Sequence, residues 1–214
     1  MDERADRERT AKDISTELKS KMSAAVKEAA LEIQKRVKLR KMPFLVAIDG
    51  GTSAGKSTLA LLVAAEVPAV IVQGDDFYQT NIDWSQMSSV EKATHCIDWK
   101  RARLEALEPL LAGRTASWHP FNFATGVGLA DYMVTRQPAP VILLEGAYSS
   151  NPQLADIIHL TILMDTPTRI RYARHNEREG HDDLEWHKIW NEAEEYYFTH
   201  VRPPSSFDLV ISTS

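Results

Sequence analysis

A glycine-rich segment carries the clearest chemistry in the sequence. It reads Gly50-Gly-Thr-Ser-Ala-Gly-Lys-Ser57 and matches the phosphate-loop (Walker A) pattern G-x-x-x-x-G-K-S/T, between an apolar run and a helical pattern. Its glycines let the backbone turn N–H groups toward phosphate oxygens, and the N-terminus of the following helix adds partial positive charge. Lys56 can reach the β- and γ-phosphates of a nucleotide, and the Ser57 hydroxyl can bind Mg²⁺. We therefore expect Mg·ATP to bind at Gly50, Gly51, Thr52, Ser53, Ala54, Gly55, Lys56, Ser57 and Thr58.

Two acidic sites follow other apolar runs, where strands are expected to end. Asp75 and Asp76 follow one run, and Glu145 ends another. Ligands of an open parallel sheet lie beyond these strand ends, where a carboxylate can accept a hydroxyl proton and help to hold Mg²⁺. We assign the proton-accepting role to Asp75, with Asp76 as the alternative; Asp76 could instead cap the following segment. Ser57, Asp75 and Glu145 are the expected metal ligands, although Glu145 could instead face solvent.

Three arginines occur at helical spacing in the segment 168–179. Arg171, Arg174 and Arg178 fall on one face of the expected helix. Beside a phosphate site, they would stabilise the negative charge spread over a transferring phosphoryl group. The alternative is a solvated helix face paired with neighbouring glutamates.

A phosphate loop alone does not distinguish a GTPase, a motor ATPase and a kinase. The sequence contains no Asn-Lys-x-Asp motif for reading guanine, which disfavours a GTPase. The acids and arginines described above favour transfer of a phosphoryl group to a hydroxyl.

Buried strands and helices alternate around these residues. Continuous apolar runs predict strands at 44–48, 69–72, 141–144, 160–164 and 207–211, and periodic patterns predict helices at 56–66, 98–111, 168–179 and 182–201. This alternation predicts an α/β fold, a P-loop three-layer sandwich with a mostly parallel five-stranded sheet. In the helix 182–201, Trp190 is expected to face the core. His175, in the helix 168–179, and His187 are expected at the surface.

The N-terminal part of the sequence predicts one long amphipathic helix. Apolar residues recur at spacings of three and four from about Thr10 to Lys41, before Pro43. We expect this helix, residues 1–41, to pack on the main domain or to join two copies of the chain as a homo-oligomer. The kinase-like domain is then 42–214, with an arginine-bearing lid around 168–182.

Composition narrows the function classes further. The 214 residues suit one domain with an appendage, and the net charge of −5 argues against nucleic-acid binding by bulk electrostatics. A single cysteine, Cys96, excludes an intrachain disulfide and a cysteine-based zinc cluster. The charged N-terminus lacks a secretory signal, and no window reaches the roughly 18–20 apolar residues of a membrane helix. We therefore expect a cytoplasmic protein without a membrane partner.

Five segments together resemble uridine kinase, within the group that includes nicotinamide riboside kinase, pantothenate kinase and phosphoribulokinase. In chain order they are Gly50–Ser57, Asp75-Asp-Phe-Tyr78, Leu144-Glu-Gly146, Arg169–Gly180 and Arg202-Pro-Pro-Ser-Ser-Phe-Asp-Leu-Val-Ile211, and the resemblance spans residues 44–212. The resemblance implies ATP- and Mg²⁺-dependent phosphorylation of a small-molecule hydroxyl, most simply the 5′-OH of a nucleoside such as uridine or cytidine. It implies the catalytic residues Lys56, Asp75, Arg174 and Arg178, although Arg178 stands one residue closer to Arg174 than in the family.

The resemblance also extends to an acceptor region. Trp118-His-Pro-Phe-Asn-Phe123 is similar to the base-contacting segment of uridine kinase, with Phe121 in place of a tyrosine. It implies substrate contacts by Asp76, Tyr78, Asp98, His119, Phe121 and Arg171. The aromatic residues could equally pack a loop onto the core, and Asp98 could cap the following helix. Other acceptors remain open: nicotinamide riboside, pantothenate or a sugar phosphate. So does a different class, a non-catalytic regulator that binds ATP.

Overall fold

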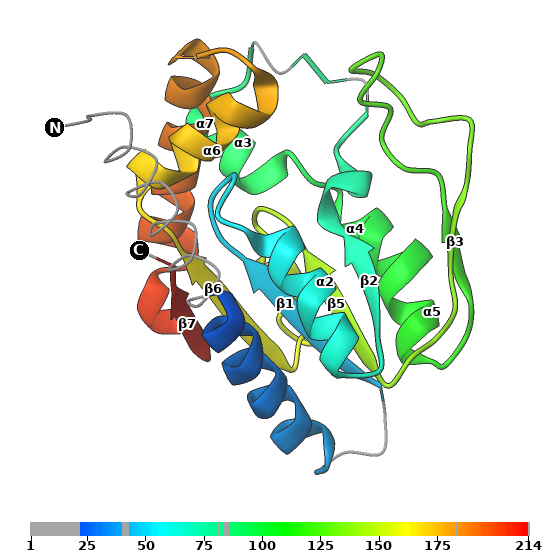
Figure 1. The fold of residues 1–214 in the computed structure, drawn as a ribbon. Helices are drawn as coiled ribbons and strands as arrows, with labels where there is room; N and C mark the ends of the chain where they lie inside the picture. Colours follow the sequence, from blue (N-terminus) through cyan, green and yellow to red (C-terminus); the bar gives the residue numbers. More distant parts are fainter. Residues whose placement is uncertain (1–21, 40–42, 81, 84–85, 183, 214) are drawn as a thin grey trace, which may run out of the picture.

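The protein is described by a computed structural model that covers residues 22–39, 43–80, 82–83, 86–182 and 184–213. Five strands form its central sheet, in the order β2-β5-β1-β6-β7, and every neighbouring pair is parallel (Figure 1). The strands are β1 (Phe44–Asp49), β2 (Ala69–Gln73), β5 (Val141–Glu145), β6 (Leu160–Asp165) and β7 (Leu209–Ser212). The predicted α/β fold with a parallel five-stranded sheet is confirmed, and each predicted strand is present to within two residues at either end.

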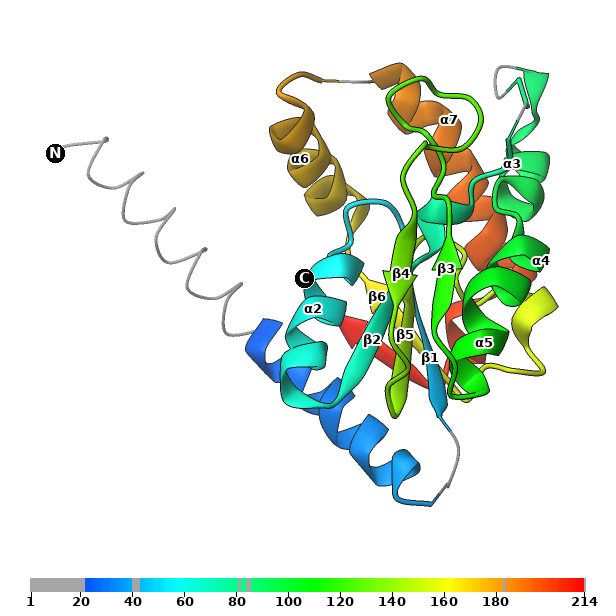
Figure 2. The same cartoon turned by 90° about the vertical axis from the view of Figure 1, so that its right-hand side faces the viewer.

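Helices cover both faces of the sheet, which makes the fold three-layered. In β1, Leu45 packs into one hydrophobic cluster, whereas Val46 and Ile48 pack into the other. Helix α2 (Lys56–Glu66) lies on the second of these faces, and α4 (Trp99–Ala102) and α5 (Glu108–Leu111) lie on the first (Figure 2). Because both faces are buried, the strands are continuously apolar, and that pattern made them recognisable in the sequence.

The described part of the N-terminal region is helical over residues 22–37 and packs on the same face as α2. Ala29 and Ile33 are fully buried against this layer. The Arg36 guanidinium donates to Asp208 Oδ1 at 3.2 Å and ties the last turn to the segment before β7. Residues 1–21 and 40–42 of the predicted helix lie outside the described residues, and the division at 41/42 stays a prediction.

Two long predicted helices contain π-helical turns. The predicted helix 98–111 consists of α4, a π turn at Arg103–Leu107 and α5. The predicted helix 182–201 consists of α7 (Leu184–Tyr196) and a π turn at Tyr197–Val201. Helix α6 (Thr168–Glu179) has its predicted bounds, and α3 (Ser89–His95), which begins with a Ser88–Glu91 capping box, was not predicted. None of the helices in the described ranges is long and apolar enough to cross a membrane.

A small antiparallel hairpin, β3 (Ala116–Trp118) with β4 (Val134–Arg136), lies outside the main sheet and was not predicted. The Phe121 N–H donates to the Asp76 carbonyl at 2.8 Å, which ties the loop between these strands to the end of β2. The hairpin loop therefore stands beside the carboxyl edge of the sheet. The described ranges also contain 3₁₀ turns at Gly74–Phe77, Pro152–Leu154 and Pro204–Ser206.

Candidate active site

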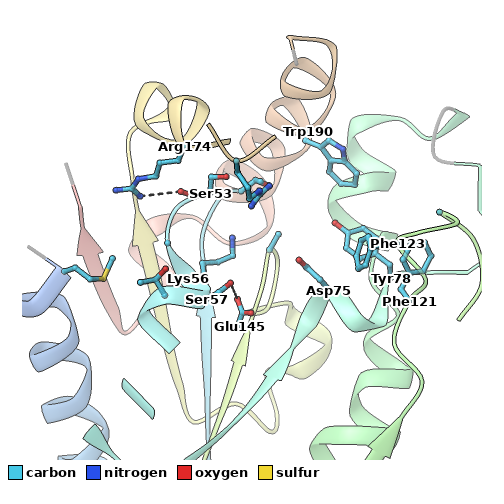
Figure 3. A pocket seen from close by; sticks show the side chains of 17 residues that line it. Ser53, Lys56, Ser57, Asp75, Tyr78, Phe121, Phe123, Glu145, Arg174 and Trp190 are labelled. Carbon is cyan, nitrogen blue, oxygen red and sulfur yellow. Dashed lines mark hydrogen bonds between the residues drawn. The ribbon is translucent and has the colours of Figure 1, made fainter. Parts of the chain in front are cut away.

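A cavity of about 700 Å³ opens beyond the carboxyl ends of β1, β2 and β5. The phosphate loop and α6 line one side, and aromatic side chains line the other, with Asp75 between them (Figure 3). Six of the nine predicted nucleotide-binding residues line it, namely Thr52, Ser53, Gly55, Lys56, Ser57 and Thr58. The position agrees with the rule that ligands of open parallel sheets bind at this edge.

Backbone conformations of the phosphate loop require glycine at two positions. Gly50 has φ +146° and Gly55 has φ +101°. A Cβ atom on Gly50 would lie 2.7 Å from the Met164 carbonyl oxygen, so only glycine fits there. Because Gly55 forms the N-cap of α2, it offers no side chain to satisfy the N–H groups of the first turn. These donors, together with the helix dipole, fit a phosphate group.

Two side chains of α2 carry the polar chemistry of the loop. Lys56 is buried, and its ammonium group donates to the Gly51 carbonyl at 2.9 Å. The Ser57 hydroxyl donates to Glu145 Oε2 at 3.0 Å, so the residues predicted from two separate segments meet at one point (Figure 3). Burial and the nearby Asp75 raise the pKa of Glu145, whereas Lys56 and the Ser57 hydrogen bond oppose this shift. The Ser57 hydroxyl lies beside the carboxylates of Glu145 and Asp75, whose negative charges repel each other. A Mg²⁺ ion would relieve this repulsion, and it prefers such oxygen ligands.

Asp75 lies in the 3₁₀ turn after β2 and faces the cavity. Removal from bulk water raises the pKa of Asp75, Lys56 and Arg178 lower it, and Asp76 adds to the rise. The Asp75 carboxylate approaches the backbone of Gly146 closely, since a Cβ there would lie 3.4 Å from Asp75 Oδ1. The carboxylate is thus held between the phosphate loop and the aromatic side of the cavity, where it can accept a proton from a hydroxyl.

Asp76 has a different environment from Asp75. Its Oδ2 accepts a hydrogen bond from Trp118 Nε1 at 2.8 Å, and its carbonyl accepts one from Arg101 at 2.7 Å. These bonds, with the Phe121 N–H bond described above, fasten the β3–β4 hairpin to the sheet. Asp76 is absent from the lining of the cavity, and its geometry is that of a structural anchor.

Four aromatic rings close the far side of the cavity. Tyr78 is central: its ring centroid lies 5.7 Å from that of Phe121, 5.6 Å from Phe123 and 6.3 Å from Trp190. All four side chains line the cavity. Tyr78 and Phe121 were predicted as substrate contacts, but Phe123 was not, and Trp190 was expected in the core. The helical period of α7 predicts that Trp190 lies on the inward-facing side of the helix. It does not predict that this side borders a cavity rather than the packed core.

The arginines of α6 divide into two groups. Arg174 and Arg178 line the cavity, and the Arg174 guanidinium donates to the Ser53 and Ala54 carbonyls at 3.4 Å each. Partial burial lowers the pKa of Arg174, which nevertheless stays charged. Arg171 instead pairs with Glu194 at 2.6 Å, and it is not among the residues that line the cavity.

Two further predicted substrate contacts also lie away from the cavity lining. Asp98 accepts the Arg101 N–H at 2.9 Å and is the N-cap of α4, as its alternative interpretation proposed. His119 is exposed, with Nδ1 at 2.9 Å from the Ala130 carbonyl oxygen. The expectation of surface positions for His175 and His187 is wrong: both are buried between α6 and α7, with their rings 4.8 Å apart.

Known proteins share both sequence and fold with the chain. The sequence is 30% identical over 145 residues to the uridine kinase of Halobacterium salinarum, which covers 64% of this chain and 62% of that protein. It is 28% identical over 167 residues to the uridine kinase of Chloroflexus aggregans, covering 75% of this chain and 78% of that protein. The chain is therefore similar, at 28–30% identity over 64–75% of its length, to proteins named uridine kinase. No family model matches it.

The fold of the chain agrees with that of a solved structure. A Bacillus stearothermophilus protein described as a possible uridine kinase superposes with a TM-score of 0.60 at 15% identity, covering 84% of this chain and 99% of that one. At this identity the likeness supports the fold alone. The chain spans 62% of the length of the Halobacterium relative, which is less than two thirds.

Proposed function

We propose that the chain is an ATP-dependent kinase that phosphorylates a hydroxyl group of a nucleoside, such as the 5′-OH of uridine or cytidine. One observation carries the proposal. A single cavity has a phosphate loop on one side, a group of aromatic rings on the other and the Asp75 carboxylate between them. The sequence relatives that bear the name uridine kinase support the same reaction class.

Residues on the donor side hold the nucleotide and the metal ion. ATP supplies the phosphoryl group, and Mg²⁺ neutralises the charge of its phosphates. The amides of the phosphate loop and the Lys56 ammonium bind the phosphate oxygens. Ser57 and Glu145 would provide the protein's oxygen ligands for the metal, which leaves Asp75 free to act on the acceptor hydroxyl.

Asp75 orients the acceptor hydroxyl and accepts its proton as the phosphoryl group is transferred. Arg174 and Arg178 lie at the cavity wall and stabilise the charge of the transferring group. Their helix also covers the loop and restricts water, which would otherwise compete as the acceptor.

Charge separates the acceptor side from the donor side of the cavity. All charged lining residues belong to the donor end or stand at the boundary, namely Lys56, Asp75, Glu145, Arg174 and Arg178. Because the acceptor end is formed by Tyr78, Phe121, Phe123 and Trp190, it suits a planar uncharged ring, which such side chains stack against. A sugar phosphate would need cations at that end. Nicotinamide riboside is the second candidate, since its cationic ring is attracted to aromatic faces.

The proposal is tested by ADP release from Mg·ATP with a panel of acceptors: uridine, cytidine, nicotinamide riboside, pantothenate and a sugar phosphate. A nucleoside should stimulate ADP release well above the rate with water alone. Stimulation by nicotinamide riboside only would select the second candidate. If ATP binds but no acceptor raises ADP release, the chain is instead a non-catalytic ATP-binding regulator.

A further inference from the structure

A buried carboxylate on α7 contacts the outer side of the phosphate loop. Glu194 Oε1 accepts the Thr52 N–H at 2.5 Å, and Oε2 accepts from Arg171 Nη1 at 2.6 Å. Both partners of this ion pair are largely buried, with side chains 11% and 6% exposed for Arg171 and Glu194. A buried carboxylate and guanidinium normally require each other, because either charge alone is costly inside a protein.

The ion pair holds Thr52 from both ends. Glu194 takes its N–H, and Arg171 donates to its carbonyl oxygen at 3.3 Å. Arg171 also donates to the Thr166 carbonyl at 3.2 Å, which anchors the guanidinium to the segment that leads into α6. The Thr52 N–H is therefore directed toward α7, while later residues of the loop line the cavity.

The loop needs this support at the next residue. Ser53 has φ +60°, a left-handed conformation that a residue with a side chain adopts only when its surroundings impose it. The pair is also packed tightly against Gly51, where a Cβ would lie 2.3 Å from Arg171 Nη1. Fixing the Thr52 peptide group thus fixes the turn from which the phosphate-facing part of the loop begins.

We propose that Glu194, through its own bond to Thr52 and through Arg171, is a positioning residue that holds the phosphate loop in the shape required for the nucleotide. The inference rests on the proposed binding of Mg·ATP at this loop. A loop held in its binding conformation beforehand loses less conformational freedom when the nucleotide binds, so its affinity is higher. Loss of the brace should therefore weaken nucleotide binding by the folded protein.

The test is calorimetric titration of the full chain with Mg·ATP, without an acceptor. Glu194→Gln keeps an oxygen for the Thr52 N–H but removes the charge that holds Arg171, and it should weaken binding about tenfold. Glu194→Ala removes both bonds and should weaken binding more. Glu195→Gln, an exposed neighbour on α7, is the matched control and should bind as the unmodified chain does.

Melting temperature is measured for every variant, because a purely structural role would lower it and leave the affinity of the folded protein unchanged. Should Glu194→Ala not fold, Glu194→Gln and Arg171→Lys keep the test, since each retains a polar group at its position. Unchanged affinity in the folded variants overturns this inference alone. Failure of the unmodified chain to bind Mg·ATP overturns the proposed function as well.

Discussion

At the scale of single residues, the cavity holds carboxylates in an environment that disfavours their charge. Burial raises the pKa of Glu145, and desolvation by the surrounding cavity walls raises the pKa of Asp75, whose side chain is still exposed to the cavity; Lys56 opposes the rise at each. Such groups are costly to a fold but useful to a kinase, because a base near the working pH transfers protons efficiently. The same two carboxylates flank the point where the loop and the aromatic rings meet.

The raised pKa of Asp75 predicts the pH dependence of the reaction. Asp75 accepts a proton only when ionised, so activity is lost as pH falls through its pKa. Since that pKa lies above the 3.8 of an unperturbed aspartate, the acidic limb of kcat/KM for the acceptor should appear at a higher pH. A pH–rate profile at saturating Mg·ATP measures it. A flat profile down to the ordinary aspartate value would exclude Asp75 as the base.

The site residues that belong to recognisable sequence motifs could be predicted, whereas those that depend on distant partners could not. Lys56, Ser57, Asp75 and Glu145 follow strand ends in recognisable patterns, and the parallel sheet then brings them together. Arg171 could not be assigned in this way, because its partner Glu194 lies 23 positions along the chain on another helix. A sequence pattern gives the face on which a side chain lies but not the group that it meets there.

At the scale of elements, α7 serves two sides of the cavity. Trp190 contributes to the aromatic wall, and Glu194, one turn later on the same face, contacts the phosphate loop. Helix α7 therefore contacts both the acceptor side and the donor side of the cavity.

Trp190→Ala should raise KM for the acceptor about tenfold while the affinity for Mg·ATP stays nearly constant, because one wall of the stacking site is removed. Initial rates at varied acceptor, together with ATP titration, measure both quantities. Ile189→Ala, at a 37% exposed neighbouring position of α7, is the matched control. Equal losses in both affinities would mean that Trp190 supports the fold rather than the acceptor.

Local patterns predicted long elements better than short ones. Helices α2 and α6 have the bounds that the sequence pattern predicted for them. Strands β3 and β4 are only three residues each, too short for alternation to be recognised. The two π turns were also missed, because a change in hydrogen-bond register leaves the hydrophobic pattern helical.

At the scale of the whole molecule, the helix over 22–37 belongs to the hydrophobic core of the described protein. Ile33 is fully buried in the cluster that includes α2 and the sheet. Ile33→Ala should lower the free energy of unfolding by about 2–5 kcal/mol, through lost burial and the cavity left behind. Urea denaturation measures the change. Leu31→Ala, at a 66% exposed position on the same helix, should change stability little.

An equal effect of the two substitutions would show that this helix does not pack as described. A large effect at Ile33 alone would show that the helix is needed for stability, whatever further role it has in joining copies of the chain.

The central claim is that Asp75 prepares an acceptor hydroxyl beside a nucleotide held by the phosphate loop. Its most direct test is acceptor-stimulated ADP release by Asp75→Asn, with Mg·ATP binding measured on the same preparation. The account predicts that kcat falls by about 10²–10⁴ while ATP stays bound, because the proton acceptor is lost and the loop is intact. Full turnover in Asp75→Asn would contradict it.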